Sequence, residues 1–350
     1  MGIGISGLGV FLPEERRSNN WWSESTVKKW TSRREDFLRS LQPVTPGEEA
    51  VAKAFREDDI FGGSKERRIA SPNVTSADME VRAVEDLIER WNVDIQSVDA
   101  LISHTPTPER LLTNPACTVH ARLKLKKSCL TMSLESASSS FLHQLQIAEA
   151  LIEAKKANSI LVTQSSLCTR LLTNDEPYSP WFGDGATAVL VSSTNRLANI
   201  KGFSNTTRGE LQDTLHATVE EGRWFDDGKA RLHTGKKEAM NKMFLGTADR
   251  AKEVIVSALH KCGLETSDID FYGCHQGTSW LRAVTQKFAG IAPAKSVDTF
   301  PWAASLSSAN LPLVLATASK EGLLLEKDTV LLYTGGTGIT DCAAVLHWGA

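Results

Sequence analysis

The apolar positions of this chain follow two periodicities that alternate from one end to the other. Short apolar runs predict buried strands at 4–11, 100–103, 129–132, 160–163, 187–191, 271–273, 297–300, 330–333 and 343–347. Apolar residues recur at helical spacing in 46–56, 76–91, 115–125, 138–152, 239–262 and 307–321. Strands that alternate with helices throughout the chain predict an α/β fold.

The chain divides into two comparable stretches on this pattern. We expect an N-terminal half over 1–195 and a C-terminal half over 196–350, each with alternating strands and helices. Residues 14–64 are polar, rich in tryptophan and irregular apart from the helix near 46–56, so they are interpreted as an insertion in the first half. With 350 residues the chain can bury a large core.

Composition narrows the class of protein by exclusion. The net charge of −3 shows no excess of basic residues that would indicate binding to nucleic acid or to an anionic membrane surface. The 41% of apolar residues is ordinary for a globular protein. The apolar runs are too short to cross a bilayer, and the N-terminus does not resemble a secretory signal. Six scattered cysteines without a CxxC pair indicate reduced thiols and no metal site. We therefore expect a cytoplasmic protein.

The most informative stretch is S-L-E-S-A-S-S-S-F at 133–141, between a predicted strand and a predicted helix. A small residue on a tight strand-to-helix turn is where a fold exposes a nucleophile, and the helix N-terminus favours developing negative charge. Ser138 is the candidate nucleophile. The alternative is that Ser138 only caps the helix and the site binds without chemistry. Glu135 could act as a second base, although a solvated carboxylate is the simpler interpretation.

This turn resembles the nucleophile turn of the ketoacyl-ACP synthase III family of the thiolase superfamily, roughly D-x-x-x-A-C-S-G-F, with Ser138 at the cysteine position. An introduced cysteine-to-serine change would give the same sequence. Further family-like motifs follow in the right order: K-E-R-R-I-A at 65–70, F-G-D-G-A-T-A at 182–188, Y-G-C-H-Q at 272–276, L-P-L at 311–313 and G-G-T-G at 335–338. The resemblance spans residues 3–348. It implies the five-layered αβαβα thiolase fold and a homodimer.

The resemblance also assigns roles within a site. His275 matches the catalytic histidine, and the backbone N–H groups of Ser138 and Thr337 match the oxyanion hole. Because a serine hydroxyl is far less acidic than a thiol, Ser138 would need a proton acceptor, which we expect to be His275. Two further features, the glycine loop and Leu112, match the family less specifically. The glycines of the loop, Gly335, Gly336 and Gly338, also suit a plain turn with positive φ, and Leu112 falls near the family's dimer loop at the acyl pocket but also suits an ordinary loop.

The chain departs from the family at the third catalytic position. The family pattern G-N-T-S-x-A-S-x-P-L aligns its asparagine with Ser305. In the family, histidine and asparagine together bind the malonyl thioester carbonyl and stabilise the enolate formed on decarboxylation. A hydroxyl offers one donor where an amide offers two, so decarboxylative condensation is in doubt. Asn310 could reach into the site from the next helical turn and assist His275, but five residues further on it is expected to face elsewhere.

The leading hypothesis is therefore an acyltransferase of specialised metabolism, similar to antibiotic-pathway relatives that carry a comparable insertion. It would move an acyl group from acyl-CoA or acyl carrier protein (ACP) through Ser138 to a small-molecule or carrier-bound acceptor, with no permanently bound cofactor. The first alternative is a condensing enzyme that primes a polyketide or fatty acid with an unusual starter unit. The second is a non-catalytic partner subunit of a related synthase.

Overall fold

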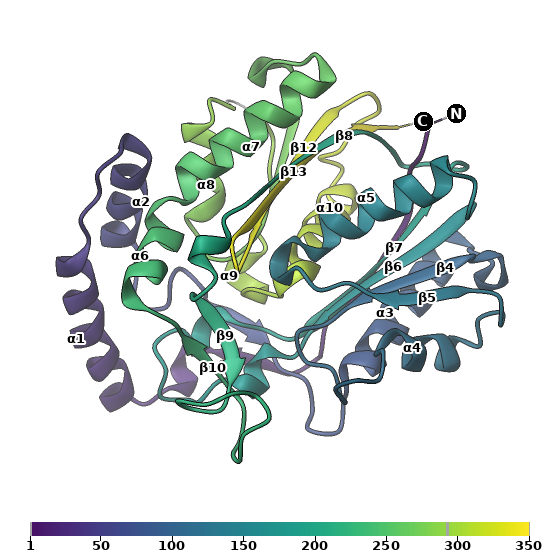
Figure 1. The fold of residues 1–350 in the computed structure, drawn as a ribbon. Coiled ribbons are helices and arrows are strands. Elements are labelled where there is room, and N and C mark those ends of the chain that lie inside the picture. Colours follow the sequence, from purple (N-terminus) through teal and green to yellow (C-terminus); the bar gives the residue numbers. More distant parts are fainter. Residues whose placement is uncertain (1, 292–293, 350) are drawn as a thin grey trace.

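A central sheet organises the protein, which we describe from a computed structural model covering residues 2–291 and 294–349. Its strands run in the order β11 (Phe271–Cys274), β12 (Thr329–Gly336), β13 (Thr340–Trp348), β8 (Ala198–Thr207), β1 (Gly4–Phe11), β7 (Gly185–Ser192), β6 (Ser159–Ser166), β4 (Ala100–His104) and β5 (Leu130–Ser133). β1 and β8 pair only through Gly4 with Asn199 and Ile5 with Ala198. The sheet is therefore two sheets joined at a narrow seam (Figure 1).

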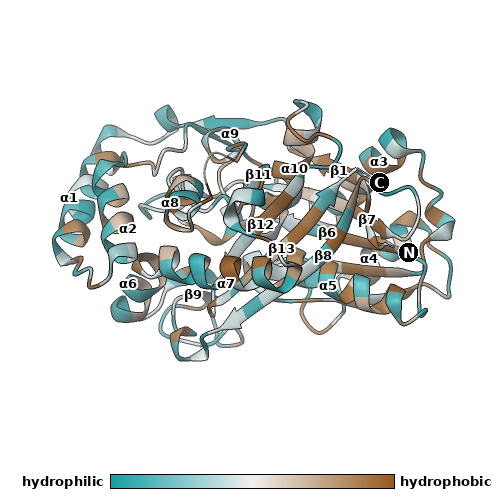
Figure 2. Cartoon of the chain, turned by 90° about the horizontal axis from the view of Figure 1, so that it is seen from above, coloured by the Kyte–Doolittle hydropathy of each residue, from teal (hydrophilic) through white to brown (hydrophobic). Residues whose placement is uncertain are grey.

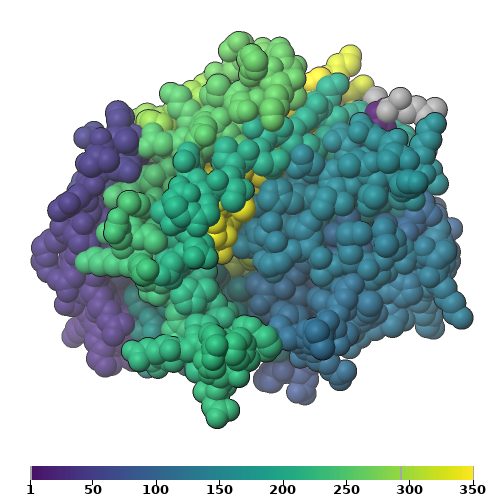
Figure 3. All heavy atoms as spheres, in the orientation of Figure 1, coloured from purple at the N-terminus to yellow at the C-terminus, as the bar shows by residue number. Residues whose placement is uncertain are grey.

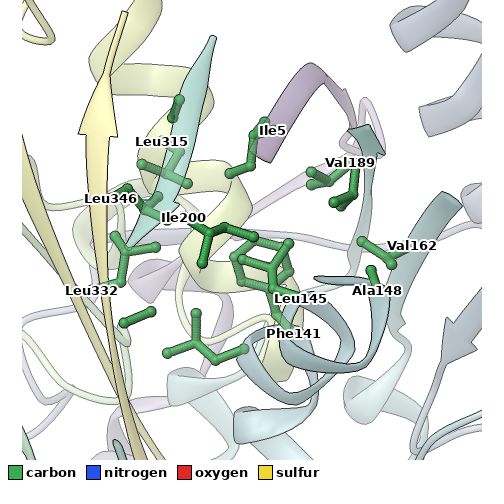
Figure 4. Close-up of a cluster of buried hydrophobic side chains, with 14 of the residues drawn as sticks. Ile5, Phe141, Leu145, Ala148, Val162, Val189, Ile200, Leu315, Leu332 and Leu346 are labelled. Carbon is green, nitrogen blue, oxygen red and sulfur yellow. The ribbon is translucent and has the colours of Figure 1, made fainter. Parts of the chain in front are cut away.

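Two helices fill the space between the two sheets. α5 (Ser140–Glu153) and α10 (Asn310–Lys320) bury apolar residues such as Leu145 and Leu315 in a shared core. Figure 4 shows these side chains pointing toward Val162 of β6 and Leu332 of β12, one from each sheet. Each fully buried side chain of this size contributes about 1.5–3 kcal/mol. This layer carries the largest continuous part of the core and links the two sheets.

The outer faces of the two sheets are covered by separate pairs of helices. α3 (Ser76–Trp91) and α4 (Ala116–Leu123) pack on the first sheet, and α7 (Thr247–Cys262) and α8 (Leu281–Phe288) pack on the second. Strands in the middle of the sheets are apolar on both sides for this reason: Leu331 of β12 faces the outer helices and Leu332 faces the inner layer. The resulting αβαβα order confirms the predicted fold.

Local sequence signals explain why α3 begins and ends where the pattern predicts. The Thr75 hydroxyl accepts a hydrogen bond from the Asp78 N–H, and the Asp78 carboxylate accepts one from the Thr75 N–H, which forms a capping box. At the other end Asn92 takes the left-handed conformation that stops the helix.

The insertion in the first half holds two helices rather than one. α2 (Pro46–Glu57) was predicted, whereas α1 (Glu24–Ser40) was not, because Trp30 is its one fully buried side chain and most of the others are polar (Figure 2). Phe55 of α2 packs edge-on against Phe244 of α6 (Lys237–Leu245) and against Trp280, which precedes α8. The insertion therefore covers the C-terminal half.

Two expected elements differ in the structure, and two pairs of strands were not predicted. Residues 297–299 form no strand and lead into α9 (Phe300–Ala303), because the Gln276 side-chain oxygen accepts hydrogen bonds from the Thr299 and Phe300 N–H groups. The helix expected over 239–262 divides at Gly246 into α6 and α7. Two small two-stranded sheets were missed: β9 (Leu215–Thr218) with β10 (Arg231–Thr234), and β2 (Arg16–Ser18) with β3 (Glu66–Arg68). The division into domains at 195/196 stays a prediction.

The described residues hold neither a membrane-spanning helix nor a cluster of metal ligands. None of the helices in residues 2–291 and 294–349 combines the length and apolar character needed to cross a membrane. In the same part of the chain, no group of three or more His, Cys, Asp or Glu side chains could hold a metal ion.

Candidate active site

The turn that carries Ser138 is strained and internally hydrogen-bonded. Ala137 has a φ of +48°, a left-handed conformation that costs a non-glycine residue about 1 kcal/mol or more. The Ser136 N–H donates to the Ser140 hydroxyl (2.8 Å), and the Ala137 N–H donates to a Glu135 carboxylate oxygen (2.7 Å). Glu135 therefore shapes the turn with its otherwise exposed carboxylate, and Ser138 sits one residue beyond the strained position.

The β12–β13 hairpin holds this turn from the other half of the chain. The Thr334 hydroxyl donates to the Ser138 carbonyl oxygen (3.0 Å), and the Ser139 hydroxyl donates to the Thr340 carbonyl oxygen (2.7 Å). A Cβ on Gly336 would lie 2.7 Å from the Ser136 carbonyl oxygen, so only glycine fits there. Close approach to the turn therefore accounts for Gly336.

Positive φ accounts for only one of the three glycines singled out in the sequence. Gly338 has a φ of +82°, whereas Gly335 and Gly336 lie in β12 with extended backbone. Thr337 is on the short turn that follows β12, and it lines the same cavity as Ser138. The proposed oxyanion-hole role of the two backbone N–H groups stays a prediction.

His275 directly follows β11 and lies in the buried wall of the cavity. The backbone N–H of His275 donates to the Tyr333 carbonyl oxygen (2.9 Å), which fixes the backbone against β12. Burial lowers the pKa of His275 to about 4, so the imidazole is neutral at pH 7. A Cβ on residue 277 would stand 3.2 Å from the His275 Nε2, and the glycine there leaves this nitrogen accessible from the cavity.

Asn310 contacts His275, contrary to the expectation that it faces elsewhere. Its Nδ2 lies 3.1 Å from the His275 Nδ1, 3.2 Å from the Ser305 Oγ and 3.3 Å from the Gln276 carbonyl oxygen. The expectation was wrong because residues 305–310 do not form a regular helix: Ser307 has a φ of +54° and a 3-10 turn follows it. An asparagine in an otherwise apolar and serine-rich buried stretch was the signal that sequence reasoning undervalued.

Ser305 lies on the cavity wall, and its backbone is held on both sides. Its N–H donates to the Trp181 carbonyl oxygen (2.8 Å), and its carbonyl oxygen accepts from the Gly183 N–H (3.0 Å). Ala304 before it has φ +57° and ψ −161°, a region that is essentially restricted to glycine. Compared with the family pattern quoted above, alanine stands here in place of glycine, and serine and asparagine have exchanged positions 305 and 310.

One cavity of about 540 Å³ connects these groups. The cavity is lined by all four candidate residues, Ser138, His275, Ser305 and Thr337. Figure 3 shows a hollow between the green and blue parts of the surface, with yellow C-terminal atoms inside it. Much of the remaining wall consists of apolar side chains of the insertion, of α6 and of the segment before β7: Phe37, Phe55, Trp181, Phe182, Met240 and Phe244.

Two of the charged groups in the cavity wall, Arg250 and Asp341, neutralise each other, whereas Arg33, Arg34, Glu176 and Lys237 also line the cavity. Arg250 forms a buried ion pair with Asp341 (3.0 Å) and donates to the Lys242 and Met243 carbonyl oxygens. Burial raises the pKa of Asp341 although Arg250 opposes this shift. Leu112 is absent from the cavity lining and fully exposed, with a φ of +73°, so its suggested place at a dimer interface stays a prediction.

Comparisons with known proteins agree with this geometry. The family model described as 3-oxoacyl-[acyl-carrier-protein] synthase III matches residues 132–209, and the model of its C-terminal domain matches residues 259–348. The first segment contains Ser138, and the second contains His275, Ser305, Asn310 and Thr337.

Similar solved structures cover nearly all of the chain. The 3-oxoacyl-[acyl-carrier-protein] synthase III of Aquifex aeolicus is 24% identical with a TM-score of 0.79, covering 99% of this chain and 100% of its own. The Thermus thermophilus synthase III is 26% identical with the same TM-score, covering 99% of each chain. OleA of Xanthomonas campestris, solved with a cysteine changed to serine and with lauric acid and lauroyl-CoA bound, is 19% identical with a TM-score of 0.79 and covers 99% of each chain.

The layered sheets and these matches define a thiolase-fold protein. More narrowly, the chain is an enzyme similar to the ketoacyl-ACP synthase III proteins of the thiolase superfamily. Enzymes of this type transfer acyl groups and use acyl-CoA or acyl-ACP as substrates.

Proposed function

We propose that the protein is an acyltransferase of specialised metabolism that works through an ester on Ser138. The observation that carries this proposal is the position of Ser138, on a strained turn at the start of α5 and on the wall of the 540 Å³ cavity. The acyl donor is a thioester of coenzyme A or ACP, and the acceptor is a small molecule or a carrier-bound group. A cytoplasmic homodimer, with Leu112 near the partner's pocket, is part of the same proposal.

The reaction has two acyl-transfer steps. In the first, the Ser138 oxygen attacks the thioester carbonyl carbon, the carbon–sulfur bond breaks, and the hydroxyl proton ends on the departing thiol. In the second, the nucleophilic atom of the acceptor attacks the Ser138 ester, gives up its proton to the serine oxygen, and carries the acyl group away. The backbone N–H groups of Ser138 and Thr337 would stabilise the oxyanion in both steps, and each such donor is typically worth about 3–4 kcal/mol.

The cavity supports an apolar group of considerable size as substrate. Its far walls are aromatic and methionine side chains, and the charges of Arg250 and Asp341 are paired with each other. An acetyl group would leave most of the 540 Å³ empty, so we propose a longer or cyclic apolar acyl chain or acceptor. The OleA structure with lauric acid and lauroyl-CoA provides a precedent among proteins of this fold.

Intact-protein mass spectrometry with acyl-CoA and acyl-ACP thioesters of increasing chain length tests the proposal. A mass increase equal to one acyl group, mapped to the Ser138 peptide and absent from Ser138→Ala, is the expected result. If no covalent species forms across the panel, the non-catalytic subunit becomes the better account.

One observation favours the condensing enzyme as the second candidate. His275 and Ser305 lie together on the cavity wall, where the family binds the malonyl carbonyl, although Ser305 replaces the amide. Release of CO₂ from malonyl-ACP at a rate comparable with acyl transfer would favour condensation over simple acyl transfer.

A further inference from the structure

The orientation of the Asn310 amide is determined by backbone groups. The Leu306 N–H donates to the Asn310 Oδ1 (2.8 Å), and the Gln276 carbonyl oxygen accepts from the Asn310 Nδ2 (3.3 Å). A flipped amide would place an NH₂ group against an N–H and an oxygen against a carbonyl oxygen, and both pairs repel. Asn310 therefore presents its NH₂ group to His275.

This orientation determines which ring nitrogen of His275 carries the proton. The Asn310 Nδ2 is a donor, so the His275 Nδ1, 3.1 Å away, must act as the acceptor. In a neutral imidazole with an unprotonated Nδ1, the proton is on Nε2. Nε2 is the nitrogen beside Gly277, which leaves it accessible from the cavity.

Asn310 acts on Ser305 in the same way. The NH₂ group lies 3.2 Å from the Ser305 Oγ and shares its two hydrogens among this oxygen, the Gln276 carbonyl oxygen and the His275 Nδ1. Because an amide NH₂ group cannot accept a hydrogen bond, the hydroxyl proton of Ser305 must point away from Asn310. Ser305 lines the cavity whereas Asn310 does not. The side chains of His275 and Ser305 are therefore both arranged to donate hydrogen bonds.

We propose that Asn310 is a positioning residue that holds His275 as its Nε2–H tautomer and turns the Ser305 hydroxyl outward, so that together they form a donor pair for a substrate oxygen. The acceptor chemistry that fits is a carbonyl or carboxyl oxygen of the bound acyl donor or acceptor. On this proposal His275 would not accept the Ser138 proton in the resting enzyme, in contrast to the role expected from the sequence, because the Nε2 lone pair would not be available.

Nitrogen-15 NMR of the histidine side chains tests this proposal without any substrate. Long-range ¹H–¹⁵N spectra of the full-length protein at pH 7 distinguish a protonated from an unprotonated ring nitrogen, and the His275→Gln spectrum identifies the His275 signals. The expected result is a protonated Nε2 and an unprotonated Nδ1. A proton on Nδ1 in the wild-type protein would overturn the proposal, and this measurement does not depend on acyl transfer.

Asn310→Asp changes the donor to an acceptor with almost no change of shape. The carboxylate should draw a proton to the His275 Nδ1 and raise the pKa of this histidine, whereas Asn92→Asp, the same change at an exposed helix end, should leave the His275 signals in place. An unchanged tautomer in a folded Asn310→Asp protein would contradict the proposal. If this variant does not fold, the wild-type spectrum still decides.

Discussion

The hydroxyl of Thr334 donates a hydrogen bond to the carbonyl oxygen of Ser138, at 3.0 Å, and Thr334 itself is fully buried. Because Thr334 belongs to β12 and Ser138 to the turn before α5, this bond ties the C-terminal half to the candidate nucleophile. It holds the peptide plane on the carbonyl side of Ser138 against the hairpin that carries Thr337.

Replacing Thr334 by valine should therefore reduce both stability and acylation. The change preserves shape but leaves a buried carbonyl oxygen without its donor, which costs about 1–3 kcal/mol of unfolding free energy. Denaturant unfolding and the acylation rate of Ser138 measure the two effects. Thr334→Ser retains the hydroxyl and serves as the control; an equal loss in both variants would show that packing, not the hydrogen bond, is responsible.

Ser138→Ala should abolish acyl labelling while the protein remains folded, because one small side chain replaces another. Ser138→Cys should acylate faster than the wild type, since a thiolate is more accessible at neutral pH and more nucleophilic than a serine hydroxyl. Intact mass spectra taken over time measure both. Labelling that persists in Ser138→Ala would assign the nucleophile to another residue.

The low pKa of His275, about 4, predicts a specific pH dependence of stability. In the unfolded chain a histidine titrates near 6.5, so between these two values the unfolded state binds more protons. The contribution of His275 to the free energy of unfolding is therefore fully present above about pH 6.5. It is lost as the pH falls toward 4, which lowers the free energy of unfolding by an amount on the order of 3 kcal/mol. Unfolding of wild type and His275→Gln at pH 7 and pH 4.5 isolates this difference. A parallel pH dependence in both proteins would contradict it.

The same pKa predicts that acylation shows no histidine titration between about pH 5.5 and 8, because His275 stays neutral throughout this range. Replacing His275 by alanine should slow acylation about 10²–10³-fold if its Nε2–H stabilises the reacting oxygen. Single-turnover acylation rates over this pH range test both statements, and a rate within a few-fold of wild type would remove His275 from the reaction.

Ala304→Gly should stabilise the protein, because Ala304 adopts φ +57° and ψ −161° immediately before Ser305. Relief of this backbone strain should raise the free energy of unfolding by about 1–3 kcal/mol. Part of this gain is offset because glycine increases the conformational entropy of the unfolded chain. Ala309→Gly, at an ordinary helical conformation in the same segment, should instead destabilise by about 1 kcal/mol. Thermal unfolding of both variants gives the comparison, and destabilisation by Ala304→Gly would argue against strain at this position.

Apolar periodicity predicted most of the layered fold because buried strands and helices must alternate in hydrophobicity. It failed where tertiary contacts decide the structure. α1 buries only Trp30 fully and partly buries Phe37 and Leu38, so its apolar stripe is too sparse to stand out from the polar residues around it. The stretch 297–300 is apolar enough for a strand, but the Gln276 side chain pairs with its backbone and starts a helical turn.

The candidate site shows the same limit at the level of single residues. Motif order placed Ser138, His275, Ser305 and Thr337 correctly on one cavity. Asn310 was misjudged because spacing along the chain does not reveal that Ser307 takes a left-handed conformation and redirects the next residues. Which nitrogen of His275 carries a proton depends on that one contact, so no pattern of residue types could have indicated it.

The two sheets that meet at the narrow seam between β1 and β8 are synthesised one after the other, and this order determines when the site is completed. Ser138 is translated well before His275 and before the β12–β13 hairpin that shapes its turn. While the N-terminal half emerges from the ribosome, Ser138 lacks His275, the Thr337 N–H and the part of the cavity wall that α6 forms. If Ser138 is the nucleophile that we propose, a chain that lacks the last strands should therefore not be acylated at this serine.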